Sequence, residues 1–443
     1  MTASTVQISR NNTSIVPMII IGGLFFVFGF ITWLNGSLIP FLQTACELSH
    51  LEAYLVTMTF YIAYTVMALP SSMILKKTGY KNGMVIGLFI MVVAAFLFIP
   101  AANERYFPLF LAALFVMGTG LTLLQTAANP YIVLLGPQES AAVRISIMGL
   151  MNKGAGIIAP IIFTSLLFSD IAQYNDARLN ALEASQRLAE LTELSQRLIL
   201  PYLVMGVVLL LLAIIIKHLP LPEITPEPEQ GDHDSSALAI LSYPQLILGA
   251  ITLFFYVGVE VIAGDTIGLF GKEMGVVNYT QLTSYTMAFM VLAYIAGMLC
   301  IPRFISQEKA LLCSALLGLL LSGLIIVSPT QNAVIWQYVL FWTSETKIPD
   351  VVIFVAMLGF ANALVWPTLW PMALNGLGKH TSTGAALLIM GISGGAILPL
   401  VYGATSQISG NSQTAYLIML PCYLFILFYA LKGHKMREWR KQP

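Results

Sequence analysis

The segments GPQESAAVRISIMG (136–149) and GKHTSTGAALLIMG (378–391) form an internal repeat, and their spacing predicts the architecture of the whole chain. The first glycine, one serine and the closing Ile-Met-Gly of the two segments are all offset by 242 positions. Each segment follows the fourth long apolar run of its own half of the chain. Halves that repeat with the same membrane orientation predict two equivalent six-helix bundles.

Composition supports a membrane-embedded chain. Of the 443 residues, 58% are hydrophobic and only 9% are charged, and the mean hydropathy is +0.83. Soluble domains carry about 25% charged residues, so water could not solvate this surface, whereas lipid could. The formal net charge is zero, which argues against a nucleic-acid partner. We therefore expect an all-α integral membrane protein.

Windows of about 20 apolar residues mark helices that could span a bilayer. Twelve such windows lie near 16–43, 51–75, 83–101, 106–135, 142–169, 199–217, 244–271, 281–305, 309–329, 349–377, 381–406 and 413–432. A Pro-rich, acidic segment at 218–243 reads as a flexible linker. The predicted domains are an N-terminal bundle (1–217), this linker and a C-terminal bundle (244–443).

The distribution of lysine and arginine predicts the orientation. With both termini in the cytoplasm, fourteen of the 21 Lys and Arg residues fall on the cytoplasmic side and six on the outer side. An excess of positive charge on the cytoplasmic side is the usual bias. The outer loop at 170–198 spaces its leucines among charged residues, which predicts an amphipathic helix over the outer mouth.

Other chemical classes lack sequence support. The four cysteines share no CxxC spacing, and the five histidines are scattered over loops and the tail. No nucleotide-binding motif is present, so an ATP-driven pump is not supported. We expect no enzyme activity and no cofactor.

Three ionisable residues lie deep inside predicted spans, namely Lys153, Glu260 and Asp265. Charges in the middle of a membrane are costly and usually functional. One interpretation is that Glu260 or Asp265 binds the coupling cation, either sodium or a proton. The other is that a Lys153–Glu260 ion pair locks the two halves together. The sequence leaves open whether Lys153 is a gate or a structural partner.

Neutral polar residues complete the candidate site. Amide side chains offer donors and acceptors that suit sugar hydroxyls, although they also join helices to one another. The amides inside predicted spans are Asn35, Gln125, Asn129, Asn152 and Asn362. Trp366 precedes Pro367 within a predicted span, where a proline breaks the helix and frees backbone groups near a cavity. An interfacial aromatic belt is the alternative for this tryptophan.

Three stretches carry a family resemblance: FFVFGFITWLNGSLIP (25–40), GLTLLQTAANPY (120–131) and LGPQESAA (135–142). They resemble the fucose/galactose/glucose symporter family of the major facilitator superfamily, along essentially the whole chain. The resemblance implies the major facilitator fold, a working monomer, a bacterial inner-membrane location and cation-coupled import of a monosaccharide.

The chain departs from the proton-coupled fucose branch at two positions. That branch has carboxylates where this chain has Gly36 and Gln125. The resemblance therefore implies a substrate of the glucose or galactose type, with sodium at Glu260 or Asp265 slightly favoured over a proton. An N-acetylglucosamine or fucose proton symporter is the alternative, and a sugar sensor without transport is the alternative of another class.

Overall fold

The computed structural model describes residues 15–134, 141–167, 174, 176–219, 240–301, 303–344, 346–377 and 381–439. These residues fold into helices joined by turns, and no strand occurs among them. Twelve of the described helices are long and apolar enough to cross a membrane. The predicted all-α class and the twelve spans are therefore confirmed.

The first half contains five long helices and one short arm. Their bounds are α1 (Ile15–Ala45), α2 (His50–Asn103), α3 (Phe107–Leu134), α4 (Ala141–Leu167), α5 (Asp176–Ala181), α6 (Ala184–Gln196) and α7 (Ile199–His218). α2 holds two predicted spans, which meet at Gly79. Gly79 has a φ of 74°, a left-handed conformation that glycine adopts without strain, so the chain turns back here.

The second half is interrupted more often. Its α-helices of seven or more residues are α9 (Pro244–Val261), α10 (Ile267–Glu273), α11 (Leu282–Cys300), α12 (Gln307–Val327), α13 (Asp350–Ala363), α14 (Val365–Leu374), α15 (Thr381–Met390), α16 (Gly394–Ser409) and α18 (Met419–Leu431). The short turns are η3 (Ile240–Ser242), η4 (Ile262–Thr266), η5 (Tyr279–Gln281), η6 (Trp336–Leu340), η8 (Gly391–Ser393), α17 (Ser412–Ala415), η9 (Tyr416–Ile418) and η10 (Gly433–Lys435).

Several interruptions in the second half lie within membrane spans, and two of them lie beside predicted site residues. The span Asp350–Leu374 breaks at Leu364. Pro367 explains this break, because its ring clashes with the carbonyl four residues earlier and it lacks an N–H. The span Pro244–Glu273 contains η4, which is a π-helical turn. Such turns are rare and occur mostly at functional sites.

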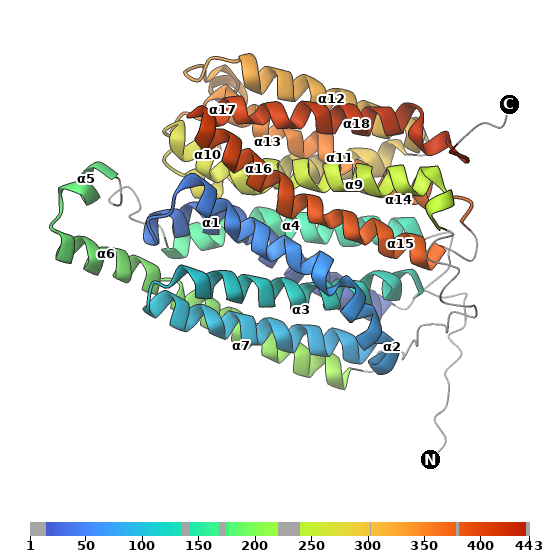
Figure 1. Cartoon of the computed structure of the whole chain (residues 1–443), viewed down its shortest axis with the longest axis horizontal. Helices are drawn as coiled ribbons and strands as arrows, with labels where there is room; N and C mark the ends of the chain where they lie inside the picture. Colours follow the sequence, from blue (N-terminus) through green and yellow to red (C-terminus); the bar gives the residue numbers. More distant parts are fainter. Residues whose placement is uncertain are drawn as a thin grey trace.

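The helices lie side by side, with their axes along the long dimension of the molecule (Figure 1). α1 begins and α18 ends at one end, which we call the terminal end; α6 projects from the other, which we call the α6 end (Figure 1). Within the first half, α1 packs on α4, and α2 packs on α3 and α7. Within the second half, α13 packs on α11 and α12, and α9 packs on α16. The two halves meet along α2–α16 and α4–α11.

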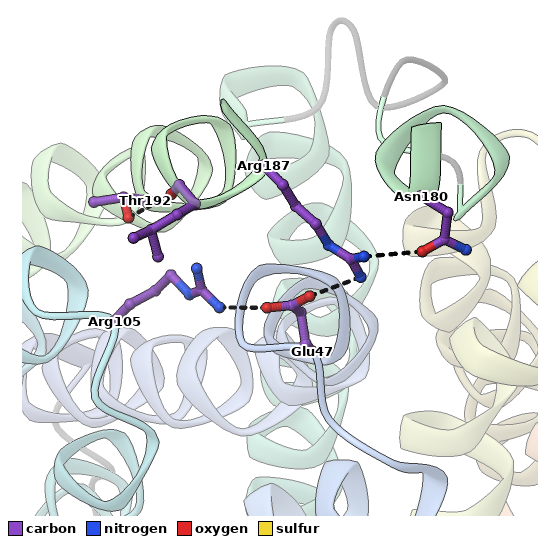
Figure 2. Close-up of polar contacts among 6 residues, drawn as sticks. Glu47, Arg105, Asn180, Arg187 and Thr192 are labelled. Atoms are coloured by element: carbon purple, nitrogen blue, oxygen red, sulfur yellow. Dashed lines mark hydrogen bonds and ion pairs between the residues drawn. The ribbon is translucent and has the colours of Figure 1, made fainter. Parts of the chain in front are cut away.

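The predicted amphipathic helix is present as α6, which continues towards the membrane span of α7. Figure 2 shows how this arm is attached to the bundle. Glu47, after α1, accepts from Arg105 and from Arg187 of α6, each at 2.7 Å. Arg187 also donates to Asn180 of α5 at 3.0 Å. Glu47 and Arg105 both have left-handed backbone, with φ of 57° and 51°, so this junction holds strained residues.

Several predicted features fall outside the described residues. Most of the predicted linker does so, since residues 220–239 are not described, and its boundaries stay predictions. Residues 136–140 and 378–380 of the repeat are also outside. The Ile-Met-Gly parts lie on α4 and at the end of α15.

Candidate functional site

An ion pair between the two halves forms the centre of the candidate site. Lys153 of α4 donates from Nζ to Oε1 of Glu260 on α9 over 2.7 Å. The two residues are only 8% and 7% exposed. The ammonium also lies 4.1 Å from the centroid of the Trp33 ring, a favourable cation–π position. Buried charges need such partners, and the ion pair considered from the sequence is present.

The first half contributes one wall of hydrogen-bonding groups beside this pair. The Trp33 indole N–H donates to Oδ1 of Asn152 over 3.2 Å. Asn152 in turn donates to the backbone carbonyl of Phe25 at 3.5 Å. Asn152 precedes Lys153 on α4, so this amide and the ammonium both lie near the α1 tryptophan. One indole thus positions two of the predicted site residues.

The second half contributes aromatic rings and a second amide. Tyr256, one turn before Glu260 on α9, lies beside the Glu260 carboxylate, and its ring is 6.3 Å from that of Trp366. Asn362 accepts from the Tyr423 hydroxyl at 2.8 Å, while its own N–H2 group is buried without a partner. The helix break at Leu364 separates Asn362 from Trp366 and allows both to approach the Glu260 region.

Asp265 lies within the π-helical turn η4, close to the pair. It is 0% exposed, and neither carboxylate oxygen has a hydrogen-bond partner. Its neighbours are Glu260, Lys153 and Thr57 of α2, whose buried hydroxyl lies close enough to stabilise the charged carboxylate. Tyr61 of α2 lies within electrostatic range. A buried carboxylate without donors is costly, which makes Asp265 a candidate for binding a cation.

Gln125 of α3 joins the site through two tyrosines of α2. Its side-chain N–H2 donates to the Tyr64 hydroxyl over 2.9 Å. The Tyr64 ring is stacked on the Tyr61 ring with centroids 6.1 Å apart, and Tyr61 lies within electrostatic range of Asp265. Gln125 is only partly buried. It therefore lies on the Asp265 side of the site.

The structure does not bring the other two predicted amides into this group. Asn35 is 2% exposed and lines a small cavity inside the first half, with Phe98, Leu114 and Tyr202. Asn129 is half-buried on α3, one turn beyond Gln125, and no described contact joins it to the ion pair. Of the predicted residues, the structure thus groups Lys153, Glu260, Asp265, Asn152, Asn362, Trp366 and Gln125.

The two halves touch closely at the α6 end of this site. A Cβ on Gly264 would lie 2.5 Å from the Trp33 ring, and one on Gly36 would lie 2.8 Å from the Gly264 carbonyl oxygen. The Ser37 hydroxyl donates to the Thr280 carbonyl at 2.5 Å. Only glycine permits so close an approach of helix to helix. The site is therefore closed towards the α6 end in this conformation.

The tyrosines around the pair were not predicted from the sequence. They are Tyr61, Tyr64, Tyr256 and Tyr423. Each lies in a span that is otherwise strongly apolar. Tyr61 and Tyr64 are three residues apart and therefore share one helix face. Buried phenolic hydroxyls usually find a hydrogen-bond partner, so this spacing indicates a helix face directed into the protein.

Known proteins are similar to this chain in sequence and in fold. Residues 21–399 match the sequence pattern of the Major Facilitator Superfamily. The chain belongs to this family. It is therefore a multi-pass membrane transporter, and the predicted major facilitator fold and family resemblance are confirmed.

Two curated relatives show how far the similarity extends. The chain is 34% identical to the glucose/galactose transporter of Brucella abortus biovar 1 (strain 9-941) over 420 residues, which cover 93% of this chain and 92% of the relative. It is 28% identical to the L-fucose-proton symporter of Escherichia coli (strain K12) over 438 residues, covering 95% and 94%. These relatives are transporters and not enzymes, in agreement with the prediction.

Solved structures agree with the assignment. The crystal structure of the E. coli fucose:proton symporter FucP matches with a TM-score of 0.72 and 26% identity, over 95% of this chain and 99% of that chain. A bacterial homologue of the human lysosomal transporter Spinster, inward-facing and occupied, matches with a TM-score of 0.64 and 14% identity. The second similarity concerns the fold alone.

Proposed function

We propose that this transporter is a symporter that imports a neutral monosaccharide of the glucose or galactose type together with a cation. The observation that carries the proposal is the buried Lys153–Glu260 pair with amides and aromatic rings on both sides of it. Amides suit sugar hydroxyls, and the apolar face of a sugar ring packs on an aromatic ring. The names of the relatives support the same substrate class.

Import would follow the alternating-access scheme of secondary transporters. The site residues come from both halves, so relative movement of the halves opens it to one side at a time. We propose that the terminal end faces the cytoplasm, because the positive-inside bias favours that side. We further propose that the protein works as a monomer in the bacterial inner membrane, with bundles 1–217 and 244–443 as the moving units.

The coupling ion is either sodium, which the sequence slightly favours, or a proton. The buried position of Asp265, away from any ion-pair partner, favours the proton. An N-acetylglucosamine or fucose proton symporter remains the alternative for the substrate.

Uptake into proteoliposomes tests the proposal. Labelled glucose, galactose and N-acetylglucosamine are each supplied with an inward sodium gradient, or without sodium and with an inward proton gradient. Accumulation of one of these sugars above the outside concentration is the expected result. Facilitated exchange without accumulation under either gradient would contradict coupling. Absence of any sugar movement, with binding retained, would favour a sensor.

A matched pair of variants tests the site. Asn152→Leu should reduce sugar affinity at least tenfold, because Asn152 lies beside the ion pair. Asn35→Leu should leave the affinity within twofold, because Asn35 lines a separate cavity within the first half. The opposite order would contradict the placement of the sugar beside the ion pair.

A further inference from the structure

Asp265 differs from the other charged groups of the site, because no charged group pairs with it. Glu260 is paired with Lys153 at 2.7 Å, whereas the buried oxygens of Asp265 have the neutral Thr57 hydroxyl beside them. Its residue exposure is 0%. Burying an ionised carboxylate without a partner costs several kcal/mol, while a protonated carboxyl is far cheaper to bury.

No further charge compensates Asp265. The charged groups near it are Lys153, which already contacts Glu260 and Trp33, and Glu260 itself, which repels it. α2 contributes Thr57 and the neutral Tyr61. The helices α1, α11 and α16 also pack against η4 and contain no Asp, Glu, Lys or Arg.

α13 contributes no charge near η4 either. Its single charged residue is Asp350, at its first position. Asp350 accepts the backbone N–H groups of Val334 and Ile335, at 3.0 and 2.8 Å, so its carboxylate is occupied in another contact.

α10 continues from η4 and carries Lys272 and Glu273 at its far end, where the Lys272 ammonium donates to the Thr44 hydroxyl at 3.1 Å. Neither oxygen of Asp265 therefore accepts from a charged group on the elements packed against η4.

The oxygen atoms around η4 suit a proton better than a metal ion. Hard cations are held by several oxygen ligands at once. The carbonyl oxygens of Ile262, Ala263 and Gly264 each accept a threonine hydroxyl already, over 2.7, 2.9 and 2.7 Å. A metal ion would have to share these carbonyl oxygens with the threonines, and beside them lie the Asp265 carboxylate and the Thr57 hydroxyl. A carboxylate beside one hydroxyl is sufficient to hold a single proton.

The position of Asp265 links its charge to the movement of the halves. Asp265 belongs to the second half, and Thr57 and Tyr61 belong to the first. Contact between the halves at the α6 end therefore buries it, and separation would expose it to water. An exposed carboxylate ionises at neutral pH, and an ionised one resists burial.

We propose that Asp265 binds the coupling proton, and that its protonation permits the two halves to close at the α6 end. This inference rests on the proposed symport and names its ion and its ion-binding residue. A proton from water on the α6 side converts the carboxylate to the neutral acid, and the site closes. Opening at the terminal end returns the proton to water there. No other bond forms or breaks.

The conformational test does not need a sugar. Spin labels are placed on the full chain at Glu104→Cys and Gln331→Cys, two exposed loop positions at the α6 end of opposite halves. The four native cysteines are first replaced by serine. In the otherwise unchanged protein, the long-distance population should grow at least fivefold between pH 5.5 and pH 8.5. In Asp265→Asn, which imitates the protonated acid, the distance between the two labels should stay short at both pH values.

Two further variants of Asp265 keep this test decisive. Asp265→Glu retains a titratable group and should retain the pH dependence. Asp265→Leu is a second neutral variant, used if the asparagine variant does not fold. The proposal would be overturned if a neutral variant gained long spin-label distances between pH 5.5 and pH 8.5 as the parent protein does. It would also be overturned if the distances in the parent protein were the same at both pH values.

The flux test separates this proposal from the proposed function. Proteoliposomes are loaded with glucose or galactose, and counterflow of labelled sugar and alkalinisation of the medium are followed. Asp265→Asn should lower proton-driven accumulation and the alkalinisation of the medium at least tenfold, because the amide carries no proton. Accumulation driven by sodium alone, with no proton movement, would overturn the role of Asp265 but leave symport intact. No counterflow by the parent protein would refute the sugar function, and the distance measurement would still decide the role of Asp265.

Discussion

Lys153→Met and Glu260→Gln remove the two partners of the central ion pair, and their effects should differ in pH dependence. Removing one partner of a buried pair typically costs about 3–5 kcal/mol, because the remaining charge is left uncompensated. The side chains of this pair are 10% and 9% exposed, and their charged atoms lie 2.7 Å apart. The pair is therefore buried enough for that range to apply.

The remaining charge can avoid this cost by changing its protonation state, which limits the cost. A glutamate with an ordinary pKa of about 4.3 is neutralised at pH 7 for about 3.7 kcal/mol, and at pH 5.5 for about 1.6 kcal/mol. The loss of stability in Lys153→Met should therefore shrink by about 2 kcal/mol on acidification. A lysine with an ordinary pKa of about 10.4 costs about 4.6 kcal/mol to neutralise at pH 7, and more at lower pH. The loss in Glu260→Gln should therefore not shrink.

Thermal unfolding of the purified protein in detergent measures these differences. Unfolding entropy scales with chain length, so 1 kcal/mol corresponds to roughly 1 °C for 443 residues. We expect Tm to fall by about 3–5 °C in each single variant at pH 7. The double variant should lose less than the sum of the two, because it leaves no unpaired charge.

Two outcomes would refute this reasoning. One is additive effects of the single variants at both pH values, which would mean that the two charges do not interact. The other is a Tm deficit in Lys153→Met that is the same at pH 7 and pH 5.5. That result would show that Glu260 does not become an unpaired buried carboxylate when the lysine is removed.

Two further predictions concern the α6 end. Glu47→Gln removes the carboxylate that accepts from two arginines and should speed amide hydrogen exchange in α6 about fivefold. A fivefold change corresponds to the roughly 1 kcal/mol expected of half-exposed ion pairs. Glu193→Gln, on the exposed face of α6, should leave the exchange rate unchanged. Unchanged exchange in Glu47→Gln would mean that other contacts hold the arm. Gly264→Ala should lower Tm and favour the open state, because its Cβ would lie 2.5 Å from the Trp33 ring. Gly23→Ala, with open space around its Cβ, should have neither effect. Equal effects of the two substitutions would contradict the close packing at Gly264.

The spans were predictable from the sequence because lipid leaves little choice of structure. Backbone groups inside a bilayer must bond within their own segment, so each apolar run of sufficient length becomes a helix. The break at Leu364 follows from Pro367 for a local reason, the missing N–H. The π-turn at 262–266 has no such local signal. Its carbonyls are capped by threonines, two of them on α11, and this pairing exists only after the helices pack.

The candidate site was predictable where charge alone decides the contact. Burying an unpaired charge costs free energy, so a lysine and a glutamate inside one membrane protein need partners. The pairing of Lys153 with Glu260 follows from this cost. The position of Asn35 depends instead on helical register. Asn35 lies two residues after Trp33, which places the two side chains about 200° apart around α1. Since Trp33 faces the ion pair, Asn35 faces the interior of the first half.

The charges of the site add up in a way that relates the ion pair to transport. Lys153 carries one positive charge, and Glu260 and Asp265 carry two negative charges when ionised. The closed site would therefore hold one net negative charge inside the membrane, and a single added proton makes it neutral. On the proposal that Asp265 binds this proton, the lysine limits the requirement to one ion per cycle by compensating Glu260 permanently. A neutral sugar adds no charge, so closure of the loaded site requires one proton, which is released when the site opens at the terminal end. Coupling then follows if the sugar and the proton are both needed for closure: the proton removes the electrostatic cost at Asp265, and the sugar supplies partners for amide groups such as the unpaired N–H2 of Asn362.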